Sequence, residues 1–416
     1  MMKMKINLAL LFSLFGLFTY AQSESLTSSP YSLYGLGVIN QSGIGKVNGM
    51  GYTGIAMKSD GYINNLNPAS YSLIPQNSFI FDVGGKAELN TYENKNNAEN
   101  NTSFNFSNIA FAFPINSKMG MGLTLIPYSQ VGYSLIGLET NIEGSTETFK
   151  SNILGSGGLN EFSGNFGYTI IPRVSVGISA SVLFGNIEEE ENFTLSSSSF
   201  SLEEETSYSG LQLGLGTQIE VLKNVSIGGT LKLPTALSGS LKRSTYKTLD
   251  YNSVTIEEEA EGDVSDFELP MQLGLGFSAR LFQNKLTING DYKKSFWDDT
   301  NQSDHIGTYA NQNIFGLGLE FNSDSRNKSY FKRISYRTGF NYDDGYLEIN
   351  DNKISSYSVT AGLGLPISNR NNSTLNLSYS YGSKGLVDNI LVKENYHLIT
   401  LNLTLQDFWF VKNLVK

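Results

Sequence analysis

The chain has 416 residues, a formal charge of −10 and no cysteine. The absence of cysteine excludes disulfides, thiolate metal sites and a lipid anchor on cysteine. Its negative charge disfavours nucleic acid as a partner, since a phosphate-binding protein needs a basic face. The 42 glycines, 23 tyrosines and 25 phenylalanines, beside only 9 prolines, indicate a single domain built from strands.

The first 21 residues predict a secretory signal peptide. Lys3 and Lys5 precede an apolar run that ends at Phe18, and Ala21 closes a small-residue cleavage site. The run is too short for a stable transmembrane helix. No later stretch holds eighteen consecutive apolar residues, so any membrane span must be built from strands.

Beyond residue 77, apolar residues alternate with polar or small ones over segments of about ten or more residues, as in LQLGLG and LITLNLTL. This pattern is typical of strands that face lipid on one side and a lumen on the other. It predicts about fourteen strands, an even number that a closed antiparallel barrel can use. The expected strands are 78–88, 102–113, 118–133, 155–171, 173–187, 206–221, 224–234, 269–281, 285–296, 310–322, 332–343, 354–365, 373–382 and 396–409.

The connections between these strands alternate in length. Short ones are expected on the periplasmic side and long outer loops at 89–101, 134–154, 188–205, 235–268, 297–309, 344–353 and 383–395; the exception is 323–331, which should be short and is intermediate. The aromatic residues Phe408, Trp409 and Phe410 fit a girdle at the membrane surface. A soluble β-sandwich would also alternate, but its strands are usually shorter and its connections do not sort by length. The prediction is therefore a transmembrane antiparallel β-barrel over 78–410, followed by a short periplasmic tail at 411–416.

Residues that could carry chemistry are few. The only histidines, His305 and His397, fall far apart, so we expect no histidine-based triad or metal cluster, no cofactor and no enzyme. Three acidic runs, at 188–191, 203–205 and 257–263, lie in predicted outer loops. They could bind divalent cations that bridge to anionic lipid, or they could simply be solvated loop charge.

Charged side chains are also expected on the lumen face of the strands. By alternation these are Asp82, Lys86, Glu88, Lys232, Arg280, Asp291, Lys293 and Arg337. Mixed charges at such positions suit a barrel that holds water or a polar plug. They could pair with one another and with the plug, or contact a substrate.

Residues 22–77 precede the first predicted strand and are too rich in glycine and asparagine to form membrane strands. Gly49, Gly51 and Gly54 are closely spaced, yet no Gly-Lys-Ser/Thr ending and no strand-glycine-helix unit supports a phosphate or dinucleotide loop. Glycines permit close backbone approach to a wall, and a proline fixes the turn that returns the chain to the first strand. We expect this segment to lie inside the barrel.

The order of Gly49 and Gly51, Asp60, and then Asn67, Pro68 and Ala69 resembles the N-terminal region of the FadL-type outer-membrane transporters. The opening SSPYSLYGLG and the ending QDFWFVKNLVK resemble the branch of that family common in Bacteroidetes. The resemblance implies a hatch that folds up into a fourteen-stranded barrel in the cell outer membrane, with Gly49, Gly51, Gly54, Asn67, Pro68 and Ala69 as hatch residues.

Two functions follow as hypotheses. The first is passive uptake of a small hydrophobic or amphipathic ligand through the plugged lumen, with a sideways exit at a gap in the wall. Pro127 in the third strand cannot donate to the ladder, so it is a candidate for a kink at such a gap, or it could equally mark a strand end near the loop side. The charged lumen puts a fatty acid substrate in doubt. The second is a non-transporting partner subunit of an outer-membrane complex, for example secretion or assembly machinery. Expected partners are outer-membrane lipid, a hydrophobic ligand, or other outer-membrane proteins.

Overall fold

The computed structural model describes residues 29–41, 43–59, 61–95, 97–141, 148–195, 198–249, 252–300, 302–303, 307–322, 329–368, 372–388 and 391–408. Several predictions therefore lie outside the described residues: the signal peptide at 1–21, the tail at 411–416, and the roles of Asp60, His305, Trp409 and Phe410.

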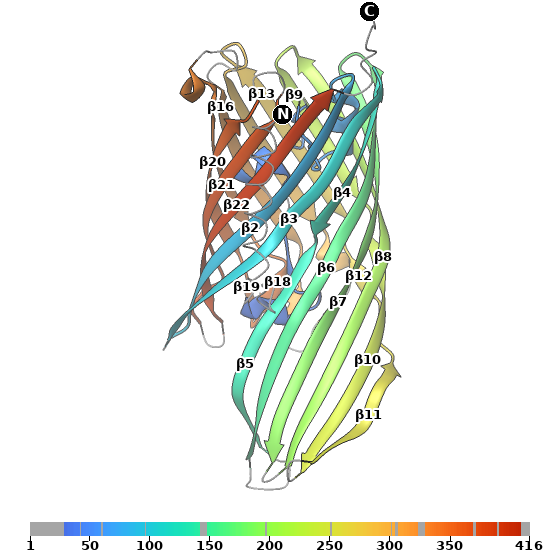
Figure 1. Cartoon of the computed structure of the whole chain (residues 1–416), viewed down its shortest axis with the longest axis vertical. Helices are drawn as coiled ribbons and strands as arrows, with labels where there is room; N and C mark the ends of the chain where they lie inside the picture. The colour runs from blue at the N-terminus through green and yellow to red at the C-terminus, as the bar shows by residue number, and fades with distance from the viewer. Residues whose placement is uncertain are drawn as a thin grey trace, which may run out of the picture.

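The described strands form a closed antiparallel barrel (Figure 1). Closure is made by the first and last wall strands, which pair from Ser78 with Phe408 to Glu93 with Lys393. The wall segments are β2 (Ser78–Glu93), β3 (Ala98–Asn116), β4 (Met119–Pro127), β5 (Ser129–Asn141), β6 (Thr148–Ile171), β7 (Val174–Leu195), β8 (Ser198–Leu222), β9 (Val225–Lys232), β10 (Thr235–Leu249), β12 (Phe267–Leu269), β13 (Gln272–Leu281), β14 (Leu286–Ser295), β16 (Gln312–Asn322), β17 (Ser335–Asp343), β20 (Ser356–Pro366), β21 (Thr374–Lys384) and β22 (Lys393–Phe408).

These seventeen segments make fourteen wall strands, because three strands are each interrupted once. The segments β4 and β5 both pair with β6, and β9 and β10 both pair with β8. The short β12 pairs with β10, while β13 pairs with β9. A proline stands at each break, at Pro127, Pro234 and Pro270, because proline cannot donate to the ladder. The prediction of a barrel of about fourteen strands is confirmed.

The alternation in the sequence corresponds to the two faces of the wall. On β8, Leu211, Leu213 and Leu215 are 60%, 47% and 49% exposed, whereas Gln212 and Gln218 are buried. Apolar side chains outside and polar ones inside reverse the arrangement of a soluble protein. This is the arrangement expected when the outer face contacts lipid.

Part of the loop prediction is wrong. Residues 89–101, 134–154, 188–205 and 235–268 mostly continue the strands, and β11 (Asn252–Gly262) adds a further strand beside β10. The strands β6, β7 and β8 hold 24, 22 and 25 residues, about twice what a membrane crossing needs. Beyond the membrane neither face has to be apolar, so the hydrophobic alternation stops while the hydrogen-bonded ladder continues.

We call the part formed by the outer ends of β5–β8 and β10 with β11 the extension. Figure 1 shows it reaching well past the rest of the barrel, at the end opposite the short turns. The acidic runs at 188–191 and 203–205, and most of 257–263, lie on its strands rather than in loops.

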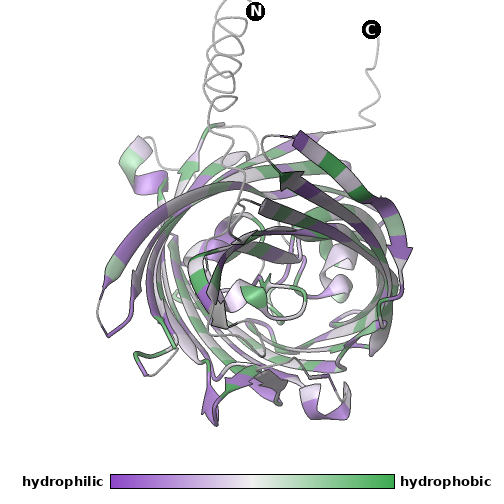
Figure 2. Ribbon diagram, turned by 90° about the horizontal axis from the view of Figure 1, so that it is seen from below, coloured by the Kyte–Doolittle hydropathy of each residue, from purple (hydrophilic) through white to green (hydrophobic). Residues whose placement is uncertain are grey.

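The N-terminal segment, residues 29–77, lies inside the barrel and is here called the plug (Figures 1 and 2). It contains the 3-10 turns η2 (Pro30–Leu33), η3 (Gly45–Gly49) and η4 (Pro68–Leu73) and the short β1 (Val38–Ile39), which pairs with β5. At the outer mouth, η5 (Trp297–Thr300) and a small sheet of β15 (Gly307–Tyr309), β18 (Leu347–Ile349) and β19 (Asn352–Lys353) form what we call the lid. The turn η6 (Tyr330–Arg333) precedes β17. None of the helical turns in the described ranges has the length or apolar character to cross a membrane.

Candidate functional site

The plug and the wall meet at a belt of glycines that face the lumen. A Cβ built on Gly177 would stand 2.3 Å from the carbonyl carbon of Pro68, and one on Gly120 would stand 2.1 Å from the backbone carbonyl oxygen of Tyr71. Such distances leave no room for a side chain, so plug backbone packs directly on wall backbone. The belt runs through adjacent register positions on four strands, at Gly120, Gly167, Gly177 and Gly216, and continues at Gly228, Gly276, Gly318, Gly339 and Gly362.

The Asn-Pro-Ala motif lies at this belt. The Asn67 side chain accepts a hydrogen bond from the Ala69 N–H at 3.0 Å and so caps η4. Its Nδ2 donates to the Ile55 carbonyl at 2.8 Å and to the Thr217 carbonyl of the wall at 2.9 Å. Both Asn67 and Ala69 are fully buried. One asparagine therefore joins two parts of the plug and one wall strand.

The three plug glycines contact different strands. Gly51 has φ of +61° and lies 2.6 Å, measured to an added Cβ, from the Phe340 carbonyl oxygen. Gly49 lies against Gly362 of β20. The N–H of Gly54 donates to the Asp291 carboxylate at 2.7 Å, and Asp291 also accepts from the Ile55 N–H at 3.0 Å.

A buried ion cluster joins plug and wall. Glu320 accepts from Lys46 of the plug at 3.0 Å and from the Arg337 Nε at 2.9 Å. The Arg337 guanidinium also donates to Asn376 at 2.7 Å. Side-chain exposure is 4% for Glu320, 5% for Arg337 and 15% for Lys46. A cluster this dry depends on Glu320, because removing it would leave the Lys46 and Arg337 charges buried without compensation.

The other predicted lumen residues are not gathered at one point. Asp82 is 1% exposed and accepts from Asn108 at 2.8 Å, from Asn402 at 2.9 Å and from Thr404. Lys232 pairs with Glu161 at 3.7 Å. Lys293 lines one lumen cavity, while Lys86 and Glu88 line another. Arg280 is half-buried on β13, in phase with the buried Ser278.

Two cavities with mixed polar and apolar linings remain between plug and wall. The first has a volume of about 190 Å³ and is lined by charged groups that include Glu161, Lys232, Lys293 and Asp343. The second, of about 180 Å³, is lined by Lys86, Glu88, Lys384 and Glu394 among others. Ligand pockets are usually larger, roughly 300–1,000 Å³, and mostly apolar. These two cavities are smaller than that and have mixed linings, so they suit water or a very small molecule.

The lid closes the outer mouth with stacked aromatic rings. The ring centroids of Trp297 and Tyr346 are 5.3 Å apart, and those of Trp297 and Tyr309 are 5.1 Å apart. Burial raises the pKa of the Tyr346 phenol, so it stays protonated and donates to the Gly37 carbonyl of the plug at 3.1 Å. The lid is therefore attached to the plug as well as to the wall.

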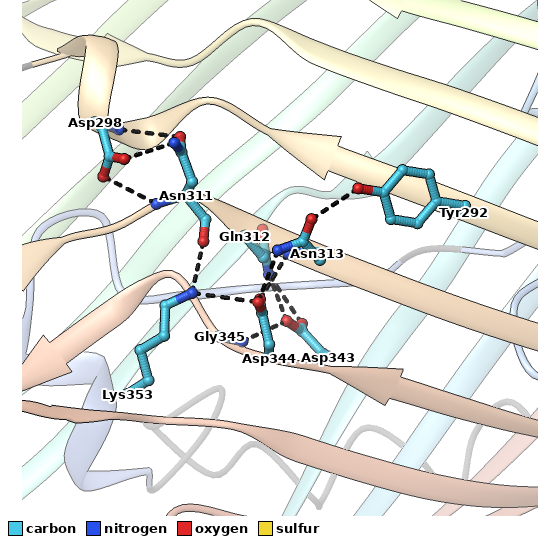
Figure 3. Close-up of polar contacts among 9 residues, drawn as sticks. All are labelled: Tyr292, Asp298, Asn311, Gln312, Asn313, Asp343, Asp344, Gly345 and Lys353. Carbon is cyan, nitrogen blue, oxygen red and sulfur yellow. Dashed lines mark hydrogen bonds and ion pairs between the residues drawn. The ribbon is translucent and has the colours of Figure 1, made fainter.

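A polar chain ties the lid strands together (Figure 3). The Asp298 carboxylate of η5 accepts from the Asn311 N–H at 3.1 Å. The Lys353 ammonium donates to the Asn311 carbonyl at 2.6 Å and pairs with Asp344 at 3.3 Å. Asp344 accepts from the Asn313 amide group at 2.8 Å. Asn313 in turn accepts from the Tyr292 hydroxyl at 2.8 Å, which connects the lid to β14.

The wall is interrupted at Pro127. The ladder between β3 and β4 covers Ile109 to Asn116, and β4 ends at Pro127. The next segment, β5, pairs with β6 and, at Ser129 and Gln130, with β1 of the plug, but not with β3. Figure 1 shows β3 and β5 diverging. Pro127 thus lies at a break between two neighbouring wall strands.

The acidic runs do not assemble into a metal site. Within the described ranges, no three acidic or histidine side chains come together as a metal ion would require. Glu188, Glu190 and their neighbours are spread along β7 and face Glu203 to Glu205 across the ladder.

Sequence reasoning missed several residues of the plug–wall contact. Glu320 stands in phase with Gly316 and Gly318 on a predicted strand, and Glu161 in phase with Ser163, so alternation could have placed both in the lumen. The belt glycines carried the same signal, alternating with leucine in LQLGLG. Lys46 lies in an irregular segment, where no periodicity exists to place it.

The fold and the filled lumen define a plugged β-barrel of the outer-membrane type. Solved structures of similar fold include the toluene transporter TbuX of Ralstonia pickettii, 17% identical with a TM-score of 0.60, and the toluene transporter TodX of P. putida, 14% identical with a TM-score of 0.62. A FadL homologue of Pseudomonas aeruginosa is 12% identical with a TM-score of 0.59. In each comparison 89% of this chain and all of the other are covered.

The chain belongs to the BamG family, whose model matches residues 1–415. No match to a curated protein was found. The resemblance to FadL-type barrels is confirmed for the fold, whereas the Bacteroidetes branch stays a prediction.

Proposed function

We propose that the protein is a closed barrel of the outer membrane that acts as a structural partner subunit of an outer-membrane protein complex, for example assembly or secretion machinery. The observation that supports this most is the filled lumen. Plug backbone packs on the glycine belt, the cluster of Lys46, Glu320 and Arg337 is buried, and the lid covers the outer mouth. A barrel closed in this way offers its surfaces rather than a channel.

The extension supports the same proposal. The strands β6, β7 and β8, of 24, 22 and 25 residues, continue beyond the membrane-facing wall, and their outer ends carry polar and acidic side chains on both faces. Such a structure offers a large polar surface to another protein outside the membrane. No enzymatic role is needed to account for any of these features.

The test is to purify the full-length protein from its own outer membranes in mild detergent and measure its mass by native mass spectrometry. Recovery in a fixed ratio with another membrane protein is expected. Recovery as a lone monomer from freshly solubilised membranes would contradict the proposal. A planar-bilayer measurement adds a second criterion, because a closed barrel should pass almost no ion current.

Passive uptake of a small hydrophobic ligand is the second candidate, and the wall break favours it. The second lumen cavity is lined by Ser107 of β3 on one side of the break and by Pro127 and Gln130 on the other. A small molecule could pass sideways between lumen and bilayer at this point. The solved structures of similar fold include proteins named toluene transporters, which is in line with such a route.

Deleting the gene and measuring uptake of labelled toluene, octanol and a short-chain fatty acid tests this candidate. Uptake should fall for at least one compound and return with the wild-type gene. Unchanged uptake of all three would remove transport from consideration.

A further inference from the structure

The wall break leaves an open strand edge outside the membrane. On one side β5 pairs with β6 from Val131 to Leu135 and again from Leu138 to Asn141, with an irregularity in the ladder between them. On the other side, the structure describes β1 at Ser129 and Gln130 and then the Ser32 hydroxyl, which bonds both the N–H and the carbonyl of Gly132 at 3.0 Å and 3.1 Å. No described strand covers this edge beyond Gly132. Open edges of this kind are templates for another chain.

Backbone direction identifies which residue would pair next. The N–H and C=O of Gly132 point away from β6, toward Ser32. Residues two apart in a strand point the same way, so those of Ser134 also point to the open edge. Ser134 is exposed, and Ile136 beyond it is 76% exposed. The plug strand β1 shows that this edge accepts a β-partner, because it already does so at its base.

The surroundings of the edge are strongly acidic. A hollow of about 1,020 Å³ lies beside it, lined by Gly132, Tyr133 and Ser134 of β5, by Asn101 of β3 and by the outer ends of β7, β8, β10 and β11. Eight of its lining residues are glutamates and only one, Lys242, is a cation. A chain that entered this hollow would meet negative charge along its length, so basic side chains would be complementary.

We propose that the outer edge of β5 is a docking site for an extended segment of a partner protein that carries lysine or arginine side chains and adds to the extension as a β-strand. This inference rests on the proposed partner function and names the surface and the chemistry of the contact. Main-chain hydrogen bonds to residues such as Ser134 would give affinity, and the glutamates would select a basic segment.

The test uses the full chain in its native membrane with two matched substitutions at one position. Ser134→Pro removes the outward N–H without removing a hydrogen bond to β6, and Ser134→Ala keeps that N–H. A photo-reactive phenylalanine at position 136 reports the contact, and mass spectrometry identifies the cross-linked peptide. We expect a cross-link to an extended, basic protein segment, lowered about tenfold by Ser134→Pro and unchanged by Ser134→Ala.

Charge-reversal substitutions provide a second test of the docking site. Glu188→Lys together with Glu190→Lys should lower the cross-link, whereas Glu268→Lys, on β12 outside the hollow, should not. A cross-link that goes only to lipid, or that Ser134→Pro leaves at wild-type yield, would overturn the docking site. If a partner still copurifies in that case, the proposed function stands without this surface; if wild-type protein has no partner at all, the proposed function itself fails.

Discussion

The membrane-level half of the barrel and the extension are made from the same strands but are held together differently. In the membrane-level half, wall glycines contact plug backbone, and the ion cluster at Glu320 is almost inaccessible to water. In the extension, the ion pair of Lys150 with Glu139 has side chains that are 70% and 60% exposed. The membrane-level half is stabilised by tertiary packing, and the extension by the hydrogen bonds between its strands. Substitutions should therefore have large effects in one half and small effects in the other.

The largest effect is expected from Glu320→Ala. It leaves the Lys46 and Arg337 charges buried without a counter-ion, which costs about 3–5 kcal/mol in comparable sites. The measurement is the free energy of unfolding in urea, with the folded fraction read from the gel mobility difference between folded and heat-unfolded barrel. Glu139→Ala in the extension is the control and should cost less than about 1 kcal/mol. Equal losses in the two variants would show that burial does not separate the two regions.

Next in size is Gly177→Ala at the belt. The added Cβ would stand 2.3 Å from the Pro68 carbonyl carbon, so the plug must shift, at a cost of about 1–3 kcal/mol. Gly229→Ala provides the matched control on another wall strand, because its Cβ would meet nothing nearer than the Thr217 methyl at 3.5 Å. Urea unfolding of both proteins, with protease sensitivity of the plug, checks the difference. A plug equally resistant in both would argue against direct backbone packing at the belt.

The lid lies between the two regions and should respond moderately. Asp344→Ala removes the carboxylate that joins Lys353 to Asn313, so local opening should become easier by about 1 kcal/mol. Hydrogen exchange of residues 307–309 and 347–353 would then speed up several-fold. Asp299→Ala, on the exposed side of η5, should leave these rates as they are. Unchanged exchange in Asp344→Ala would mean that the aromatic stack alone holds the lid.

The wall strands could be predicted well from the sequence because a lipid-facing strand alternates apolar and polar residues with a strict period of two. LQLGLG places its leucines outward and its glycines inward, and the structure has both. The extension was wrongly predicted as loops because its strands, such as the one through Glu203 and Glu205, do not face an apolar environment and so lack an apolar alternation. All three interruptions lie at prolines, and the sequence analysis considered a kink at one of them, Pro127. The pairing of β1 with β5 could not be anticipated, since it joins positions about ninety residues apart.

The plug was predictable in part. Its glycines and the Asn-Pro-Ala motif are visible in the sequence, and their partners on the wall are visible as alternating glycines. The contacts of Lys46 and Asn67 depend on where an irregular chain meets a curved wall. No local pattern encodes that meeting, so these contacts required the structure.

The smallest effect, with the opposite sign, is expected within the extension. Glu203 lies directly opposite Glu190 across the ladder, and like charges in that position repel. Glu203→Gln should therefore slow hydrogen exchange at the outer ends of β7 and β8, by an amount equal to a few tenths of a kcal/mol. Its neighbour supplies the contrast: Glu204 also faces a glutamate, Glu189, but it accepts from the Arg243 Nε at 2.7 Å, so Glu204→Gln should slow exchange less than Glu203→Gln does. Both changes should shrink as salt rises toward 1 M, since exposed charges are screened there. Exchange that changes with neither substitution nor salt would show that charge across the ladder does not contribute to the stability of the extension.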